Sequence, residues 1–494
     1  MYLGKNDSIM EPPMVDFLNS VDSVLYYPIL IIVLAAAGIY FSIRTRFVQI
    51  RLFVEAIRSL IERPHEAGGV SSLQALLVST ASRVGTGNII GVSTAICLGG
   101  AGAAFWMWVL AIIGASSAFV ESTLAQVYKH RDHRTNACYG GPAYYIESAL
   151  HSRWLGVVFA VFLISTYAFG FNLLCSYNLQ STFETYSFYN PSVTPWIIGI
   201  ILAVLVGFCL FGGGKRIVKT TGVLVPVMGL FYVILAAIML IAHFDLIPSV
   251  IVAIMQDAFD FQAIGGGIAG SCLMYGIKRG LYSNEAGVGS APNAAASAHV
   301  SHPVKQGLAQ MLSVYIDTLF LCTATALMCL VSGVPGTAEN AGAMYVQQSV
   351  STTFGVAGPV FITIAMTLFA FTTLLGNLYY VHNAIAYINK KKMPGKKTMA
   401  AIHIACSLVV LFGAVTPMDA CWALADITMG GMALINLPAC VILGGVAFKA
   451  LRDYEFQRNQ GRNPAFIARH IGMDPDKLDY WKHKERDEKD SPSI

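Results

Sequence analysis

The sequence predicts an all-α polytopic membrane protein, and three observations support this fold class. The 494-residue chain is 55% hydrophobic and only 12% charged, and its mean hydropathy is +0.60, a composition typical of chains that span a bilayer many times. Apolar runs of about 20 residues, enough to cross roughly 30 Å of hydrocarbon, recur along the chain. Lys and Arg collect in alternate connecting segments, as they do in membrane proteins of fixed orientation. A soluble enzyme is therefore excluded.

Eleven apolar runs are expected to be transmembrane spans. They centre on residues 24–43, 72–98, 103–127, 154–184, 195–212, 217–243, 262–298, 306–332, 356–388, 399–416 and 419–447. If the N-terminus lies outside, the inner segments hold 30 of the 32 Lys and Arg, and the exceptions are Lys5 and Arg83. The positive-inside rule then places the N-terminus outside and the C-terminus in the cytoplasm.

The number of spans suggests one peripheral helix followed by two related halves. Because each half has five spans, the second half is inverted relative to the first. The chain then divides into an N-terminal segment with the peripheral helix and a cytoplasmic linker (1–71), a first five-helix repeat (72–243), an outer connector (244–261), a second, inverted five-helix repeat (262–447) and a cytoplasmic tail (448–494).

The second span carries a polar, glycine-containing run at its centre, from Ser82 to Asn88. Two glycines beside Arg83, Thr86 and Asn88 predict a local unwinding, because glycine is a poor helix-interior residue. Lipid cannot satisfy the backbone groups that unwinding exposes, so such a break must be buried in protein or line a cavity. The alternative, in which glycine only lets two helices pack closely, explains one glycine better than this run.

The seventh span, the first of the second half, is also expected to be interrupted. Its glycine-rich stretches are Gly265 to Gly267, Gly270-Ser271-Cys272, and Tyr275 to Gly280. Interrupted segments at corresponding positions of two halves indicate the binding site of a secondary transporter. We therefore expect Gly270, Ser271 and Cys272 to border the same site as the break in span two.

The two half-helices that meet at the first break offer opposite polarity. The N–H groups of Gly85, Thr86 and Gly87 lie beside the positive end of the following half-helix and suit a substrate carboxylate. The C=O groups around Ala81 and Val84 suit a hard cation such as Na⁺. The Asn88 side chain serves either the cation or the substrate, or alternatively makes a structural interhelical hydrogen bond.

Adjacent hydroxyls in the ninth span offer further cation ligands. Thr372 and Thr373 lie at mid-membrane and can complete a sodium site with the carbonyls of span two, although a Thr in a helix often only bonds its own i−4 carbonyl. Asn377 lies four residues after Thr373 and therefore on the same helix face.

Ionisable residues inside spans mark either function or a buried pair. Structural ion pairing is the favoured role, with a proton-coupling carboxylate as the alternative, for the acidic residues Glu121, Asp317 and Asp426 and their possible partners Arg83, Lys278 and Arg279. Glu285 is expected near the cytoplasmic end of span seven, in an inner gate or a helix cap.

The remaining segments give weaker indications. Residues 248–257 and 338–349 are expected to be short amphipathic pieces on the outer surface, as gates or as connectors. The tail from Arg452 to Ile494 alternates charge densely and is expected to be a solvated helix and loop. The chain has no nucleotide-binding motif, no C-x-x-C and no His cluster at metal spacing, so no cofactor is expected.

Several ordered motifs closely resemble those of the alanine or glycine:cation symporter family, the sodium:alanine symporter type. They extend over residues 24–447 and include Val84-Gly85-Thr86-Gly87-Asn88-Ile89, Phe105-Trp106-Met107-Trp108, Tyr139-Gly140-Gly141-Pro142, Arg279-Gly280, Ser283-Asn284-Glu285-Ala286-Gly287 and Asp317-Thr318-Leu319. The resemblance implies eleven helices with a leucine-transporter-type core of two inverted five-helix repeats. It also implies sodium-coupled uptake of a neutral amino acid across a bacterial or archaeal cell membrane.

Carried over by position, the resemblance assigns roles to the break. Thr86 and Gly87 hold the amino-acid backbone, and Na⁺ is held by Ala81, Val84, Thr372 and Thr373. Thr373 is also expected to face the substrate. The expected partners are an amino acid, Na⁺ as the coupling ion and the lipid bilayer, with no nucleic acid and no obligate protein partner. A proton-coupled transporter and a passive channel remain as alternatives.

Two departures from the family pattern concern the substrate side chain. Asn377 stands where the family commonly has a tryptophan, and Cys175 ends a stretch that commonly reads Asn-Met-Val-Gln. If Cys175 and Asn377 border the substrate, the pocket is larger and more polar than one shaped for a methyl group. Glutamine is therefore an alternative substrate to alanine or glycine.

Overall fold

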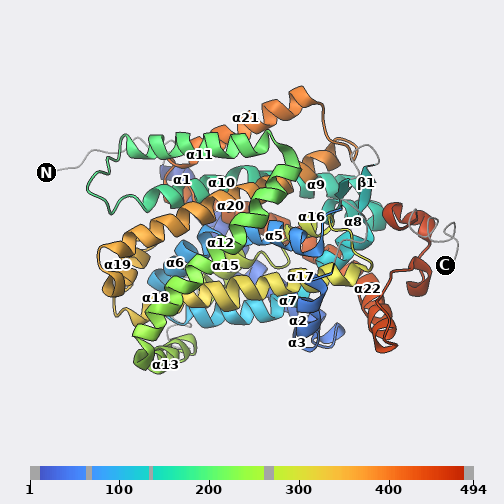
Figure 1. Ribbon diagram of the computed structural model, residues 1–494, viewed down its shortest axis with the longest axis horizontal. Helices are drawn as coiled ribbons and strands as arrows, with labels where there is room; N and C mark the ends of the chain where they lie inside the picture. The colour runs from blue at the N-terminus through green and yellow to red at the C-terminus, as the bar shows by residue number, and fades with distance from the viewer. Residues whose placement is uncertain (1–11, 63–68, 133–136, 261–271, 483–494) are drawn as a thin grey trace.

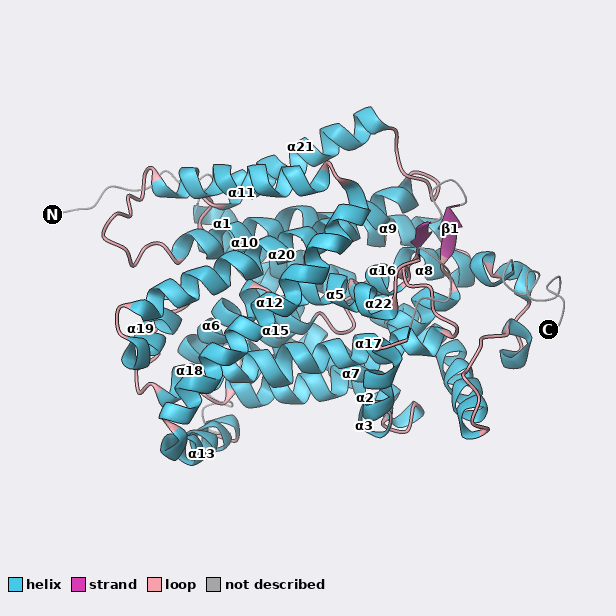
Figure 2. Ribbon diagram, viewed as in Figure 1, coloured by secondary structure: helices cyan, strands magenta, loops and turns pink. Residues whose placement is uncertain are grey.

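A computed structural model describes residues 12–62, 69–132, 137–260 and 272–482. Long helices run side by side along its longest axis (Figure 1), and two short strands are the exception among the described residues (Figure 2). Eight helices in the described ranges are long and apolar enough to cross a membrane, and two shorter apolar stretches cover Gly87–Gly99 and Thr194–Leu210. These features confirm the expected all-helical polytopic class.

The first half of the chain contains the following elements. They are α1 (Pro12–Val24), a π-helical turn at Leu25–Leu30, α2 (Ile31–Arg44), α3 (Val48–Arg51), α4 (Phe53–Leu60), α5 (Ser72–Arg83), a π-helical turn at Gly87–Gly91, α6 (Val92–Gly99), α7 (Ala103–Val127), β1 (His130–Asp132), β2 (Ala137–Tyr139), α8 (Pro142–Leu150), α9 (Arg153–Ile164), a π-helical turn at Ser165–Gly170, α10 (Phe171–Ser181), α11 (Thr194–Leu210) and α12 (Gly213–Ala242). β1 and β2 pair antiparallel as one hairpin.

In the second half, the regular elements among the described residues are all helical. After a 3-10 turn at Phe244–Leu246, its elements are α13 (Ile247–Ala258), α15 (Cys272–Asn284), α16 (Ala291–Ala295), α17 (Pro303–Val314), a π-helical turn at Tyr315–Cys322, α18 (Thr323–Val331), α19 (Ala343–Phe354), α20 (Ala357–Ile388), α21 (Lys396–Gly413), α22 (Met418–Asn459) and 3-10 turns at Ala468–Ile471 and Pro475–Lys477. The expected amphipathic pieces at 248–257 and 338–349 overlap α13 and α19.

Helix α7 lies at the centre of the bundle and packs against α15, α17 and α2. Its small residues allow close approach of neighbouring backbones. A methyl group added at Gly114 would lie 3.0 Å from Ala286, and one added at Gly38 of α2 would lie 3.0 Å from the Ile113 carbonyl oxygen. This close packing places the segment after α15 directly beside α7.

The structure corrects the expected interruption of span seven. Tyr275 to Gly280 lie inside the continuous helix α15, and the first two glycine-rich stretches lie outside the described residues except for Cys272. Gly276 faces α7, where an added methyl group would lie 2.6 Å from the Ala103 carbonyl oxygen. This glycine therefore permits helix packing and does not unwind the chain.

The break in the described part of span seven comes instead at residues 285–290, between α15 and α16. Glu285 has a positive φ of 52°, and Gly287 and Gly289 have φ values of 84° and 89°. These left-handed conformations end α15 where α7 and α22 converge, and two glycines tolerate them without a Cβ clash.

The C-terminal tail also differs from expectation. Residues 464–481 fold back against the bundle, and Leu478, Tyr480 and Trp481 are at most 1% exposed. The prediction of a solvated helix and loop was therefore wrong for this part of the tail. Apolar side chains lie between its charged residues, and their burial attaches the segment to the bundle.

Candidate functional site

The break in span two forms as the sequence predicts. Helix α5 ends at Arg83, Val84 leaves helical geometry with ψ at 89°, and the chain resumes as a π-helical turn at Gly87. A capping box of Ser71 and Gln74 fixes the start of α5.

At the break, two backbone N–H groups donate to acceptors other than the carbonyl four residues earlier. Gly85 N donates to Asn88 Oδ1 over 2.7 Å, and Asn88 N donates to Gly85 O over 3.2 Å. In a continuous helix these N–H groups would bond to the carbonyls of Ala81 and Val84. Both carbonyls thus lose their usual helical donors, which is the condition for a backbone cation site.

Thr373 of α20 faces this break. A methyl group added at Gly85 would collide with Thr373 Oγ1, and this hydroxyl is buried without a hydrogen-bond partner among the described residues. The neighbouring Thr372 donates to Leu368 O at 2.9 Å and also lies 3.1 Å from Met228 Sδ. The structure therefore separates the two hydroxyls: Thr373 is uncommitted at the break, whereas Thr372 makes the i−4 bond of an ordinary helical threonine.

Thr86 lies on the other side of the break, between polar groups from α10 and α15. Its Oγ1 accepts a hydrogen bond from Asn178 Nδ2 over 3.1 Å and lies 3.4 Å from the Tyr282 hydroxyl. Cys175, one turn before Asn178 on α10, donates to Ala370 O of α20 over 3.3 Å. All these side chains are at most 5% exposed, so this side of the break is closed.

An aromatic layer covers Thr86 and Gly87. The Tyr282 ring lies edge-on to Phe171 and Trp422, with centroid distances of 4.7 and 4.8 Å. A methyl group at Gly87 would lie 2.9 Å from the Tyr282 ring, so only glycine fits beneath it. The sequence analysis did not single out Phe171, Asn178, Tyr282 or Trp422, and the tertiary fold brings them to the break.

Asn88 is fully engaged within the protein. Besides accepting from Gly85, its Nδ2 donates to Asp317 Oδ1 over 2.7 Å. Ser283 and Thr318 also donate to Asp317 Oδ2, each over 2.9 Å. The amide thus makes the interhelical hydrogen bond that the sequence left as the alternative to ligand binding, and it joins the break to α15 and the segment after α17.

Asn377 lies one turn further along α20, beside the α5 side of the break. Its Nδ2 donates to Asn172 Oδ1 over 3.0 Å, and its Oδ1 accepts from Ser82 over 2.7 Å. Ser82 Oγ also lies 3.2 Å from Glu285 Oε1. The buried Glu285 therefore belongs to the second break itself, and Asn377 links that break to α5 and α10.

The intramembrane charges divide into two groups. Asp426 lies 3.0 Å from Arg279 and 3.5 Å from Lys278, which confirms structural pairing there. Arg83 instead donates to Gln310 O and Ser313 Oγ of α17, and no carboxylate of the described residues lies within ion-pair distance. Glu121 accepts from Asn436 over 2.7 Å, so its predicted pairing with a cation is not seen in the described part of the chain.

Three predicted positions remain, Gly270, Ser271 and Cys272, and the structure describes only the last of them. Gly270 and Ser271 lie outside the described residues. Cys272 begins α15, ten residues and thus about 15 Å of helix before Tyr282, and its thiol lies 3.6 Å from Asp257 O of α13. The structure therefore places Cys272 away from Thr86 and Gly87.

A closed, polar break inside an apolar helical bundle defines a membrane transport protein. Among the described residues no group of three or more acidic, His or Cys side chains is placed to hold a metal ion.

Comparison with known sequences identifies the family. The profile of the sodium:alanine symporter family matches residues 12–468, so the chain belongs to this family and is a transporter, not an enzyme. The amino-acid carrier protein AlsT of Bacillus subtilis is 42% identical over 461 residues, covering 93% of this chain and 97% of AlsT. The probable sodium/glutamine symporter GlnT of the same organism is 41% identical over 459 residues, covering 92% and 94%. The sodium/alanine symporter AgcS of Methanococcus maripaludis is 34% identical over 461 residues, covering 91% and 99%.

Proposed function

We propose that this protein couples the inward movement of Na⁺ to the uptake of a neutral amino acid by alternating access. The observation that carries the proposal is the break at Val84 to Thr86, where the carbonyls of Ala81 and Val84 lose their helical donors and the Thr373 hydroxyl lies nearby without a partner among the described residues. The names of its relatives support sodium as the coupling ion and an amino acid as the substrate.

The proposed architecture has eleven spans, with the N-terminus outside and the C-terminus in the cytoplasm. In this proposal residues 72–243 form one five-span repeat, and residues 262–447 form the second, inverted one. The breaks at Val84–Thr86 and at residues 285–290 then occupy the first span of each repeat, as a leucine-transporter-type core requires.

The proposed cation site consists of backbone and hydroxyl oxygens. The carbonyls of Ala81 and Val84 and the hydroxyl of Thr373 lie at the break without their usual internal donors. Thr372 retains oxygen lone pairs despite its bond to Leu368, so it completes the set. Oxygen ligands of this kind suit a hard cation such as Na⁺.

The proposed substrate site lies at Thr86 and Gly87. Their N–H groups begin the half-helix that continues into α6, so its positive end faces the amino-acid carboxylate. Cys175 and Tyr282 border this position, and we assign them to the substrate side chain. Asn377 contributes through Asn172, which lies one turn from Cys175 on α10.

Uptake of labelled alanine into proteoliposomes tests the function. An inward Na⁺ gradient is expected to drive accumulation, and replacing Na⁺ by K⁺ on both sides is expected to abolish it. Accumulation driven by a proton gradient alone would favour proton coupling, and a substrate-insensitive ohmic current would favour a channel. Either outcome would contradict sodium symport.

Competition with glutamine tests the size of the substrate pocket. With Cys175 and Asn377 in place of bulkier family residues, excess unlabelled glutamine is expected to inhibit alanine uptake. No inhibition at a hundredfold excess would restrict the substrate to small amino acids, since one extra methylene changes binding by only about 1–3 kcal/mol.

A further inference from the structure

The C-terminal residues 464–481, here called the tail strap, attach to the bundle by a buried aromatic anchor. Trp481 is 0% exposed, and its Nε1 donates to Gln126 O of α7 over 3.0 Å. Lys129 Nζ lies 3.8 Å above the Tyr480 ring. Asp479 Oδ2 lies 2.6 Å from His130 Nδ1 of β1. One end of the strap is thus fixed to α7 and the hairpin.

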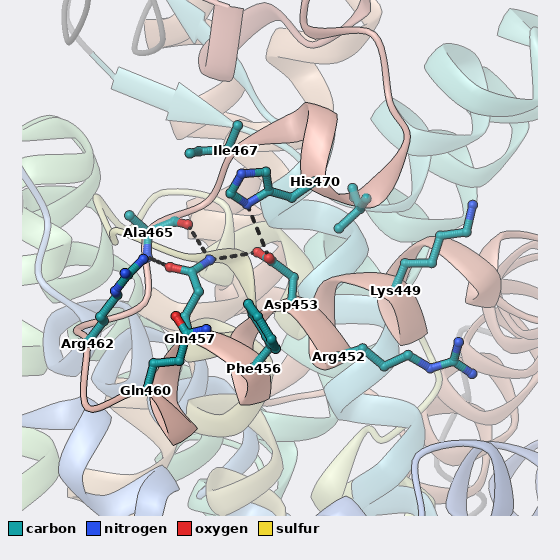
Figure 3. A pocket seen from close by; sticks show the side chains of 11 residues that line it. Lys449, Arg452, Asp453, Phe456, Gln457, Gln460, Arg462, Ala465, Ile467 and His470 are labelled. Atoms are coloured by element: carbon teal, nitrogen blue, oxygen red, sulfur yellow. Dashed lines mark hydrogen bonds and ion pairs between the residues drawn. The ribbon is translucent and has the colours of Figure 1, made fainter.

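The other end of the tail strap is fixed to α22, as Figure 3 shows. Gln457 bonds Ala465 twice, accepting from its N–H and donating to its carbonyl, each over 2.9 Å. Asp453 lies 3.3 Å from His470 of the strap and 3.2 Å from His302. The strap therefore extends between α22 and α7 across one end of the bundle (Figure 1).

Beside its attachment to α22 the tail strap also bonds the joint of the two broken spans. The joint is the loop of residues 296–302, which links α16 to α17, together with the start of α5. His299 N donates to Val70 O over 2.9 Å, which ties the loop to α5. Phe466 N donates to Ser301 O over 2.9 Å, and Ser301 Oγ donates to Pro464 O over 2.8 Å.

Opening this end of the molecule requires the joint to move. Helices α5 and α16 are the half-helices that lead from this end to the two breaks, and alternating access exposes the site by displacing such segments from their neighbours. The joint is now closed, with Ala298 0% and Ser301 3% exposed. The strap holds the joint against α7 and α22, which are continuous helices without an unwound segment.

We propose that the tail strap is an autoinhibitory latch that holds the tail-side gate of the transporter closed and must detach before that gate opens. This inference rests on the proposed alternating access. The polar contacts at the rim of the aromatic anchor are partly exposed: the Asp479 and His470 side chains are 44% and 49% exposed. Exposed pairs of this kind contribute little, so the strap can open without unfolding the bundle. The family match ends at residue 468, so the aromatic anchor is a feature of this chain beyond the matched region.

Cys138 is a native reporter of strap release. This β2 thiol is 4% exposed and lies 3.6 Å from His299 of the joint, and the Tyr480 ring packs on His299 with a centroid distance of 6.2 Å. We expect Trp481→Ala to raise the alkylation rate of Cys138 by about tenfold, as expected when a local opening loses its buried anchor. Lys477→Ala, at an exposed strap position, is the matched control and is expected to leave the rate unchanged.

Gln457→Ala provides a second variant at the opposite attachment, in case the tryptophan variant fails to fold. Gln457 is partly exposed, and its replacement by alanine removes both hydrogen bonds to Ala465. The variant is expected to raise the alkylation rate of Cys138 while its melting temperature stays near that of the wild type. Peptide-resolved mass spectrometry of the full-length protein in detergent measures the rate without requiring transport. Failure of wild-type uptake would therefore refute the proposed function alone. Wild-type Cys138 alkylation in the folded variants would overturn the latch.

Discussion

At the residue scale, the break depends on an exact fit between Gly85 and Thr373. Gly85 donates its N–H to the Asn88 side chain, and its missing side chain leaves the space that the Thr373 hydroxyl occupies. The same atom of Thr373 is uncommitted among the described residues. One glycine thus allows the approach of α20 that the proposed cation site requires.

Gly85→Ala is expected to impair transport strongly. The added methyl group must displace Thr373, and overpacking of this kind costs about 1–3 kcal/mol, so sodium-driven uptake should fall by about tenfold. Gly229→Ala in α12 is the matched control, because no described atom lies within 4 Å of its added methyl group. Equal uptake by the two variants would show that transport does not depend on the position of the Thr373 hydroxyl beside Gly85.

At the element scale, the two breaks differ in how readily the sequence reveals them. Ser82 to Asn88 combine glycine with polar residues in an otherwise apolar run, and the helix ends there. In span seven, glycine spacing alone misled the prediction, because Gly276 serves packing against α7 while Glu285 and Gly287 form the described break. A helix-packing glycine and a helix-breaking glycine look alike until the neighbouring helix is known.

The contacts of the site were less predictable than its position. Thr86, Thr373 and the two carbonyls follow from local sequence, since each lies at or beside a polar interruption. Asn178 and Tyr282 lie on helices with several other polar residues, and only the packing of α10 and α15 brings these two to Thr86. Tertiary contacts of this kind leave no local pattern in one sequence.

Gly276→Leu tests the packing role of the α15 glycine. The leucine side chain would meet the Ala103 carbonyl and the Trp106 side chain of α7, so the variant is expected to lose at least about 1–3 kcal/mol of stability. Gly445→Leu, at an exposed position of α22 with open space around it among the described atoms, should leave the melting temperature in detergent unchanged. Equal melting temperatures would refute the close packing of α15 on α7.

At the scale of the whole molecule, one ion cluster joins the peripheral helix to the core. Lys278 of α15 pairs with Asp22 of α1, and Asp426 of α22 pairs with both Lys278 and Arg279. The Arg279 guanidinium also lies 3.6 Å from the Trp422 ring centroid, next to the aromatic layer over the break. The cluster therefore connects three helices beside the proposed substrate site.

Asp426→Asn is expected to destabilise the whole protein. Removing one partner leaves Arg279 and Lys278 incompletely compensated in a buried position, which costs roughly 3–5 kcal/mol. Glu147→Gln is the control, because its pairs with Arg153 and Lys391 are partly exposed and are worth about 0–1 kcal/mol. Thermal melting in detergent distinguishes the two variants. An unchanged melting temperature for Asp426→Asn would contradict a stabilising role of this ion cluster.

The sodium dependence of uptake in Thr373→Ala tests the central claim most directly. Thr367→Ala is the matched control, because its hydroxyl lies on the same helix and donates to Thr363 O over 2.7 Å, away from the break. If Thr373 is a sodium ligand, its loss should raise the half-saturating Na⁺ concentration by about tenfold, the effect of losing roughly 1.4 kcal/mol of binding free energy, while Thr367→Ala matches the wild type. An unchanged sodium requirement in Thr373→Ala would contradict the assignment of the cation site to this break.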